Sequence, residues 1–302
     1  MVPMPAELQH AYAQLSNGMR LHYASAGAGP LILFVHGFPE FWYGWKDQLD
    51  AFSSDHRAVA LDMRGYNLSA KPADVKAYRA RYLVEDLRLL IDHLGGGPCV
   101  MVAHDWGGAV AWTFAAQHPE YLRRLIMINA PHAITFAREL RDNPAQQRAS
   151  AYMNLFRSEK AERVLSENNY ARLVRMTIDT WTANGGATTA KDRAAYVAAW
   201  SQPGALTGGL NYYRASPLHP PQPGGAQEAV GLQLDPARFH VRTPTLVIWG
   251  ERDEALLPGN LDGLEAYVSD LSVVRVPDAS HWIVHERPQL VNRLIRDALA
   301  GA

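Results

Sequence analysis

The chain has 302 residues, of which 48% are hydrophobic and 20% are charged, and its formal net charge is −1. This length accommodates one large core with an inserted subdomain. The near-neutral charge excludes a strong basic field that would attract nucleic acid or an anionic membrane surface. The single cysteine, Cys99, excludes an intrachain disulfide and a cysteine-based zinc cluster. No signal-like segment opens the chain and no stretch reaches the roughly 18 apolar residues of a membrane span, so we expect a cytoplasmic protein.

The first part of the chain alternates strand patterns with helical patterns. Asn17-Gly18 predicts a tight turn between strands over 10–15 and 19–25. Further apolar runs predict strands, and 3.6-residue spacing predicts helices between them. The strands are expected at 31–35, 58–61, 99–103 and 125–128, and the helices at 45–52, 82–94 and 109–117. This alternation predicts an α/β fold with a doubly wound, mostly parallel sheet.

The alternation stops after residue 132. From about 133 to 231 only helical patterns occur, and the proline- and glycine-rich residues 217–225 indicate a rigid exit linker. Strand patterns resume at 245–249 and 271–276, and a closing helix is expected at 288–299. We therefore expect a core formed by residues 1–132 and 232–302, with an all-helical lid, 133–231, inserted into it.

One strand is predicted to end in a sharp turn into a helix. The segment from Ala103 to Gly108 has the form of a nucleophile elbow, usually written G-x-S-x-G, with Asp105 at the position of the nucleophile. A carboxylate is a poor nucleophile toward esters and amides, because the product would be an anhydride. It can attack a saturated carbon that carries a leaving group, forming an ester on the enzyme. Asp105 therefore indicates epoxides or alkyl halides as substrates.

Two more reactive side chains follow later strands. In an open parallel sheet, reacting groups gather at the carboxyl ends of the strands. Asp253 follows the strand at 245–249, and His281 follows the last strand. The order nucleophile, acid, histidine is the one expected for this hydrolase architecture. Asp253 is predicted to orient His281 as the base, with Glu251 and Glu254 as alternatives for that acid.

Several neighbours of these residues are assigned secondary roles. The backbone N–H groups of Phe38 and Trp106 are expected to form an oxyanion hole for the ester carbonyl. Glu40 is interpreted first as a cap of the following helix and second as a residue that positions water. His104 and His132 are interpreted as structural hydrogen-bonding residues.

Three motifs together resemble those of α/β-hydrolases in the epoxide hydrolase and haloalkane dehalogenase group. They are His36-Gly37-Phe38-Pro39, Arg64-Gly65-Tyr66 and the elbow at Asp105, and the similarity covers nearly the whole chain. The residues support a two-step reaction, in which Asp105 forms an ester and water activated by His281 hydrolyses it. No metal or organic cofactor is required, since water is the second substrate.

The leaving group of the substrate distinguishes epoxide hydrolases from haloalkane dehalogenases. An epoxide oxygen leaves as an alkoxide and needs a proton donor, for which tyrosine is suited. Tyr213 matches the second lid tyrosine of epoxide hydrolases and Tyr152 resembles the first, whereas Tyr212 is expected to point elsewhere. The resemblance implies that both catalytic tyrosines, Phe38 and Trp106 contact the substrate. We therefore expect a small-molecule epoxide and water as substrates, vicinal diol as product, and a monomer or homodimer.

Two alternatives remain open. A halide needs two N–H donors, and Phe38 stands where dehalogenases commonly have an asparagine, so Trp181 is the conceivable lid donor for a haloalkane dehalogenase. Trp106, where fluoroacetate-type dehalogenases usually carry an arginine, argues against that substrate. The other alternative is a non-catalytic ligand-binding homologue that retains the pocket.

Overall fold

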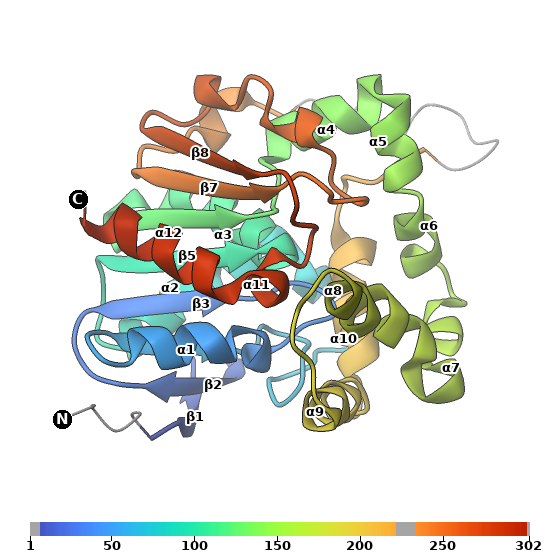
Figure 1. Ribbon diagram of the computed structural model, residues 1–302, viewed down its shortest axis with the longest axis horizontal. Helices are drawn as coiled ribbons and strands as arrows, with labels where there is room; N and C mark the ends of the chain where they lie inside the picture. Colours follow the sequence, from blue (N-terminus) through green and yellow to red (C-terminus); the bar gives the residue numbers. More distant parts are fainter. Residues whose placement is uncertain (1–6, 222–233, 301–302) are drawn as a thin grey trace.

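The computed structural model describes residues 7–221 and 234–300, and its centre is an eight-stranded sheet (Figure 1). Its strands are β1 (Gln9–Gln14), β2 (Arg20–Ala26), β3 (Leu31–Val35), β4 (Arg57–Leu61), β5 (Cys99–His104), β6 (Leu122–Ile128), β7 (Thr245–Gly250) and β8 (Leu271–Val276). Their order in the sheet is β1-β2-β4-β3-β5-β6-β7-β8. β2 is antiparallel to β1 and β4, and the other five pairs are parallel. The predicted mostly parallel, doubly wound sheet is confirmed.

Helices cover both faces of the sheet. α1 (Lys46–Phe52), α11 (Ile283–Glu286) and α12 (Pro288–Ala300) lie on the near face in Figure 1, and α2 (Ala80–His93) and α3 (Asp105–Gln117) lie behind it. β5 shows why its sequence is continuously apolar. Val100 and Val102 pack with the core cluster under α1 and α12, whereas Met101 and Ala103 pack with the cluster under α2 and α3. Alternate side chains of a strand point to opposite faces, so both sets must be apolar.

The predicted boundaries of these strands and helices agree with the structure to within two residues except at two places. The hairpin over β1 and β2 is confirmed, with a positive φ of 85° at Gly18 in its turn. α3 begins at Asp105, four residues before the predicted helix, because the turn at the end of β5 leads directly into the helix. β6 begins at Leu122, three residues before the predicted strand. Arg123 and Arg124, the less buried residues at its start, interrupt the apolar pattern there.

Seven α-helices follow one another in the described residues between β6 and β7. They are α4 (Ala133–Asp142), α5 (Pro144–Ala149), α6 (Tyr152–Arg157), α7 (Ala161–Val174), α8 (Thr180–Ala183), α9 (Ala190–Trp200) and α10 (Ala205–Ala215). The described residues of this segment contain no strand, as the helical patterns predicted. Figure 1 shows most of these helices beside the sheet rather than over its faces.

Two sequence-based boundaries fall on residues that the structure does not describe. Residues 222–225 of the expected linker and the expected end of the lid at 231 lie outside the described residues, so the division into core and lid stays a prediction. Within residues 7–221 and 234–300, no helix is long and apolar enough to cross a membrane.

Candidate active site

Asp105 occupies a strained position between β5 and α3. Its φ is 51°, in the left-handed region of the backbone that residues other than glycine and asparagine rarely adopt. Such conformations persist where the surrounding structure enforces them, and they cluster at functional sites. Two glycines allow the turn: a Cβ at Gly107 would lie 2.4 Å from the backbone oxygen of His36, and one at Gly108 would lie 2.2 Å from Cβ of Ala130. This is the sharp strand-to-helix turn expected of a nucleophile elbow.

The two carboxylate oxygens of Asp105 have different surroundings. The backbone N–H of Phe38 donates a hydrogen bond of 2.7 Å to Oδ1. A Cβ at Gly37 would lie 2.1 Å from that same oxygen, so only glycine leaves room for it. Oδ2 instead lies 3.7 Å from Nε2 of His281. One oxygen is therefore held by a backbone donor, and the other faces an imidazole.

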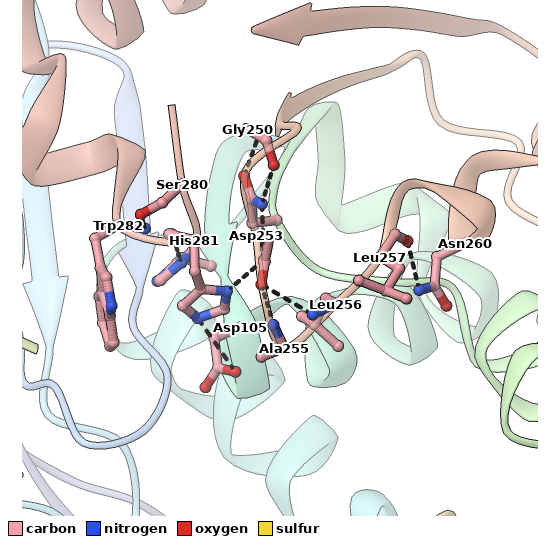
Figure 2. A network of polar contacts seen from close by, with 12 residues as sticks. Asp105, Gly250, Asp253, Ala255, Leu256, Leu257, Asn260, Ser280, His281 and Trp282 are labelled. Carbon is pink, nitrogen blue, oxygen red and sulfur yellow. Dashed lines mark hydrogen bonds and ion pairs between the residues drawn. The ribbon is translucent and has the colours of Figure 1, made fainter. Parts of the chain in front are cut away.

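His281 lies between two carboxylates (Figure 2). Its Nδ1 donates to Oδ2 of Asp253 over 2.7 Å, while its Nε2 faces Asp105. Of the other acids considered for the Asp253 role, Glu251 accepts a hydrogen bond from Arg275 and Glu254 is exposed. The acid that contacts the histidine is therefore Asp253.

Asp253 is buried and held by a residue that the sequence reading missed. The backbone N–H groups of Ala255 and Leu256 donate to its Oδ1 at 2.8 and 2.9 Å, and the Asn129 side chain donates to Oδ2 at 2.9 Å. Asn129 also exchanges two hydrogen bonds with the backbone of Gly250. Its position directly after β6, at the same edge of the sheet as the other reactive groups, was the signal that could have identified it.

Burial and charge have opposite effects on this pair. Burial alone would lower the pKa of His281, but the charges of Asp253 and then Asp105, together with the hydrogen bond to Asp253, raise it to about 9. Burial likewise opposes ionisation of Asp253, yet the charge of His281 holds the pKa of that carboxyl below its ordinary value. At neutral pH the resting site is therefore an imidazolium between two carboxylates.

Glu40 does not cap a helix, so that interpretation is wrong. The turn over 42–45 has Phe41 at its N-cap and no side-chain cap, because the Glu40 side chain is directed into the protein. Its Oε1 accepts hydrogen bonds of 2.6 Å from Tyr196 and from Nε2 of His285. Its Oε2 lies 3.6 Å from Nδ1 of His104. The alternative, a role in positioning water, stays a prediction.

His104 and His132 have the structural roles that the sequence indicated. Nε2 of His104 donates to the backbone oxygen of His281 over 2.9 Å. Nε2 of His132 donates to the backbone oxygen of Phe239, and its Nδ1 accepts from Ile134 at the start of α4. Burial lowers the pKa of His132 to about 4, so it is neutral.

A cavity of about 190 Å³ brings the two lid tyrosines and Asp105 together. Among the described residues that line it, Asp105 carries the only charge. Burial, reinforced by the charge of Asp105, raises the pKa of Tyr152. Burial, together with electrostatic repulsion from Tyr152 and Asp105, raises the pKa of Tyr213. The Tyr213 ring packs edge-on against the rings of Trp106 and Phe38, with centroids 5.0 and 5.4 Å away, respectively. Both hydroxyls are thus protonated across the working pH range.

The contacts of three further residues bear on their roles. The Tyr212 hydroxyl donates to the backbone oxygen of Arg64, away from Asp105. Arg64 is a structural residue of its loop, since its guanidinium forms two hydrogen bonds with Asp86. The indole N–H of Trp181 donates to Thr188 over 2.6 Å. The conceivable lid donor for a halide therefore already has an acceptor.

Known proteins share this sequence and this fold. Residues 30–288 match the family model described as alpha/beta hydrolase fold. The chain is 36% identical to epoxide hydrolase 4 of Mus musculus, over 95% of this chain and 78% of that protein, and 38% identical to the AB hydrolase superfamily protein YfhM of Bacillus subtilis, over 94% and 96%. The crystal structure of Bacillus megaterium epoxide hydrolase in complex with an inhibitor matches with a TM-score of 0.89 and 41% identity, covering 96% of this chain and 100% of that one. The chain therefore belongs to the α/β-hydrolase fold family and, within it, to the epoxide hydrolases.

Proposed function

We propose that this protein is an epoxide hydrolase, which opens an epoxide to a vicinal diol through a covalent ester on Asp105. The observation that carries the proposal is that the carboxylate at the elbow lines the same cavity as the protonated hydroxyls of Tyr152 and Tyr213. The related proteins support the same reaction. A variant of the Bacillus megaterium enzyme, 40% identical to this chain, was crystallised with its product, a naphthyloxy-propane-1,2-diol.

In the first step Asp105 attacks an epoxide carbon. Oδ1 is held by the Phe38 N–H, so Oδ2 is the attacking oxygen. The new bond joins Oδ2 to the carbon as the carbon–oxygen bond of the ring breaks. Tyr152 and Tyr213 hydrogen-bond the departing oxygen, and one of them transfers its proton to the alkoxide. The resting imidazolium of His281 supplies a proton to the resulting tyrosinate, which leaves His281 neutral.

In the second step water hydrolyses the ester. Esterification removes the negative charge of Asp105, one of the contributions that keep His281 protonated. Neutral His281, oriented by Asp253, then takes a proton from water that attacks the carboxyl carbon of Asp105. The N–H groups of Phe38 and Trp106 stabilise the oxyanion, and removing one such donor typically slows the step by about 100- to 1,000-fold. The ester bond then breaks, the remaining water proton passes from the new carboxyl group to the departing oxygen, and the diol leaves with both the carboxylate and the imidazolium restored.

The same proposal assigns the helical segment 133–231 the role of a lid over the core. Tyr152 begins α6 and Tyr213 lies in α10, so both tyrosines come from this segment, whereas Asp105 begins α3, directly after β5 of the core. Rings from the two parts are in contact, as between Phe38 and Phe156 at 5.2 Å. Apart from Asp105, the described lining of the cavity is uncharged and mostly apolar, which favours uncharged aryl or alkyl epoxides over charged ones.

Turnover of styrene oxide, stilbene oxide and 1-bromobutane tests the function. Wild type is compared with Asp105→Ala and with Asp142→Ala, a control at a surface carboxylate that pairs with Arg141. The proposal predicts diol without bromide release, lost in Asp105→Ala and retained in the control. Bromide release instead would assign the protein to the dehalogenases. Absence of both products would contradict catalysis and favour the non-catalytic homologue.

A further inference from the structure

A second buried carboxylate–histidine pair lies beside the proposed site. Glu40 follows β3 and His285 lies in α11, and Nε2 of His285 is 2.6 Å from Oε1 of Glu40. The two side chains are only 2% and 9% exposed, respectively. The pair uses residues 245 positions apart in sequence, and the reaction as described above does not require it.

The pair is connected to the catalytic histidine through one residue. Oε2 of Glu40 lies 3.6 Å from Nδ1 of His104, and Nε2 of His104 donates to the backbone oxygen of His281. The rings of His104 and His281 are 4.6 Å apart. A charge on Glu40 is therefore close enough, in a buried region, to influence the charge on His281.

Glu40 is ionised in spite of its burial. Burial alone favours the neutral acid, but the charge of His285, together with its hydrogen bond to Glu40, holds the pKa of Glu40 well below its ordinary value. A buried carboxylate requires such a partner, since an unpaired buried charge is strongly unfavourable. Without a counter-charge, Glu40 would stabilise the imidazolium of His281, which is the form that cannot act as a base.

The surroundings of His285 suit a positive charge. The indole of Trp181 from α8 stacks on the imidazole, with centroids 4.1 Å apart and planes at 23°. Tyr196 from α9 presents a neutral hydroxyl to Glu40. The ring centroid of Trp282 lies 6.5 Å from that of His285. The charged neighbours on its own segment already have partners: Glu286 accepts from Ser280 and Asn184, and Arg287 pairs with Asp278.

We propose that His285 is a positioning residue for the ester-hydrolysis step: its positive charge neutralises Glu40, and His281 can therefore give up its proton once Asp105 is esterified. The inference rests on the proposed two-step function. It predicts an effect on ester hydrolysis, which needs neutral His281, and not on the attack of Asp105, which takes place while His281 is still an imidazolium. It also predicts that the effect of His285 disappears when Glu40 carries no charge.

The test follows formation and decay of the alkyl-enzyme with styrene oxide by rapid quench and intact mass, from about pH 5 to 10. The proteins are wild type, His285→Gln, Glu40→Gln and the double variant. Glutamine retains an N–H donor for Glu40 but carries no charge. His118→Gln is the matched control, because His118 directly follows α3 at the end opposite Asp105, about 20 Å away along the helix.

In His285→Gln the acidic limb of the decay rate should move up by about one pH unit, so decay below that limb slows roughly tenfold. The rate of ester formation should stay within about twofold, and His118→Gln should behave as wild type. In the Glu40→Gln background, whatever its own rate, His285→Gln should leave the limb in place. His285→Lys, which restores a positive charge, should return the acidic limb to its wild-type position. If His285→Gln does not fold, His285→Lys and Glu40→Gln still test the proposal, because each should keep the wild-type limb.

Two results would overturn the inference. One is an unmoved limb in a folded His285→Gln. The other is a shift of equal size with and without the charge of Glu40, which would indicate a purely structural role for His285. Failure of wild type to form any alkyl-enzyme is a different outcome, since it would refute the proposed function itself.

Discussion

Asp253→Asn tests the link between buried charge and chemistry most quantitatively. The asparagine keeps the size of the side chain and can still accept from the N–H groups of Ala255 and Leu256, but it removes the charge beside His281. Its amide N–H₂ also favours the wrong imidazole tautomer, with the proton on Nε2 rather than Nδ1. The base is therefore both weakened and misdirected.

The size of the effect follows from the pKa of His281. A rise from 6.5 to about 9 corresponds to roughly 3 kcal/mol of preference for the imidazolium, at about 1.36 kcal/mol per pH unit. Asp253 is the main source of that preference, and Asp105 makes a smaller contribution. We therefore expect the pKa of His281 to fall by at least about one unit in Asp253→Asn. Ester hydrolysis should slow on the order of 1,000- to 10,000-fold, the scale seen when the acid of a serine triad becomes an amide.

Two assays measure the two parts of this prediction. Proton NMR follows the titration of the His281 ring, assigned by its absence in His281→Gln, in wild type and in Asp253→Asn. Rapid quench with styrene oxide measures ester formation and decay, with Glu254→Gln as the control at an exposed neighbouring carboxylate. The expected result is an accumulated ester with slow decay. An unchanged titration, or a slow reaction in which no ester accumulates, would refute the reasoning.

Three further outcomes are expected. Gly37→Ala should unfold at a temperature near that of wild type but lose turnover, because the new Cβ would lie 2.1 Å from Oδ1 of Asp105; full turnover would contradict that crowding. Tyr152→Phe and Tyr213→Phe should each slow ester formation about 100-fold in single-turnover experiments, and unchanged rates would exclude them as acids. The raised pKa of His281 stabilises the fold fully below about pH 6.5, and this contribution is lost as pH rises through about 9. In denaturant titrations the free energy of unfolding of wild type, relative to His281→Gln, should therefore fall by up to about 3 kcal/mol over that range, and a constant difference would count against the ion pair.

Much of the fold could be predicted because buried strands impose a strong pattern. All six residues of β5 are buried, so both of its faces demand apolar side chains and the run is easy to recognise. The start of β6 escaped because Arg123 is exposed, and a strand that emerges from the core loses its apolar pattern. The start of α3 escaped because Asp105 serves as a helix residue whose side chain belongs to the cavity rather than to an apolar stripe.

The candidate site was predictable where residue type and position in the motif coincide. Asp105 and His281 follow strands whose carboxyl ends meet at one edge of the sheet, so topology alone brings them together. Asn129 also follows such a strand, but an asparagine in a loop has too many ordinary roles to be singled out. The contact of Glu40 with His285 could not be read from the sequence, because it depends on how α11 packs against the loop after β3.

A single turnover in water labelled with oxygen-18 tests the central claim most directly. With enzyme in excess over styrene oxide, the account predicts that the diol of the first turnover contains no label, because its new oxygen comes from the carboxylate of Asp105. The peptide that contains Asp105 should gain one labelled oxygen from the water that hydrolyses the ester. A labelled diol with an unlabelled peptide would contradict the account, since it would show that water attacks the epoxide directly.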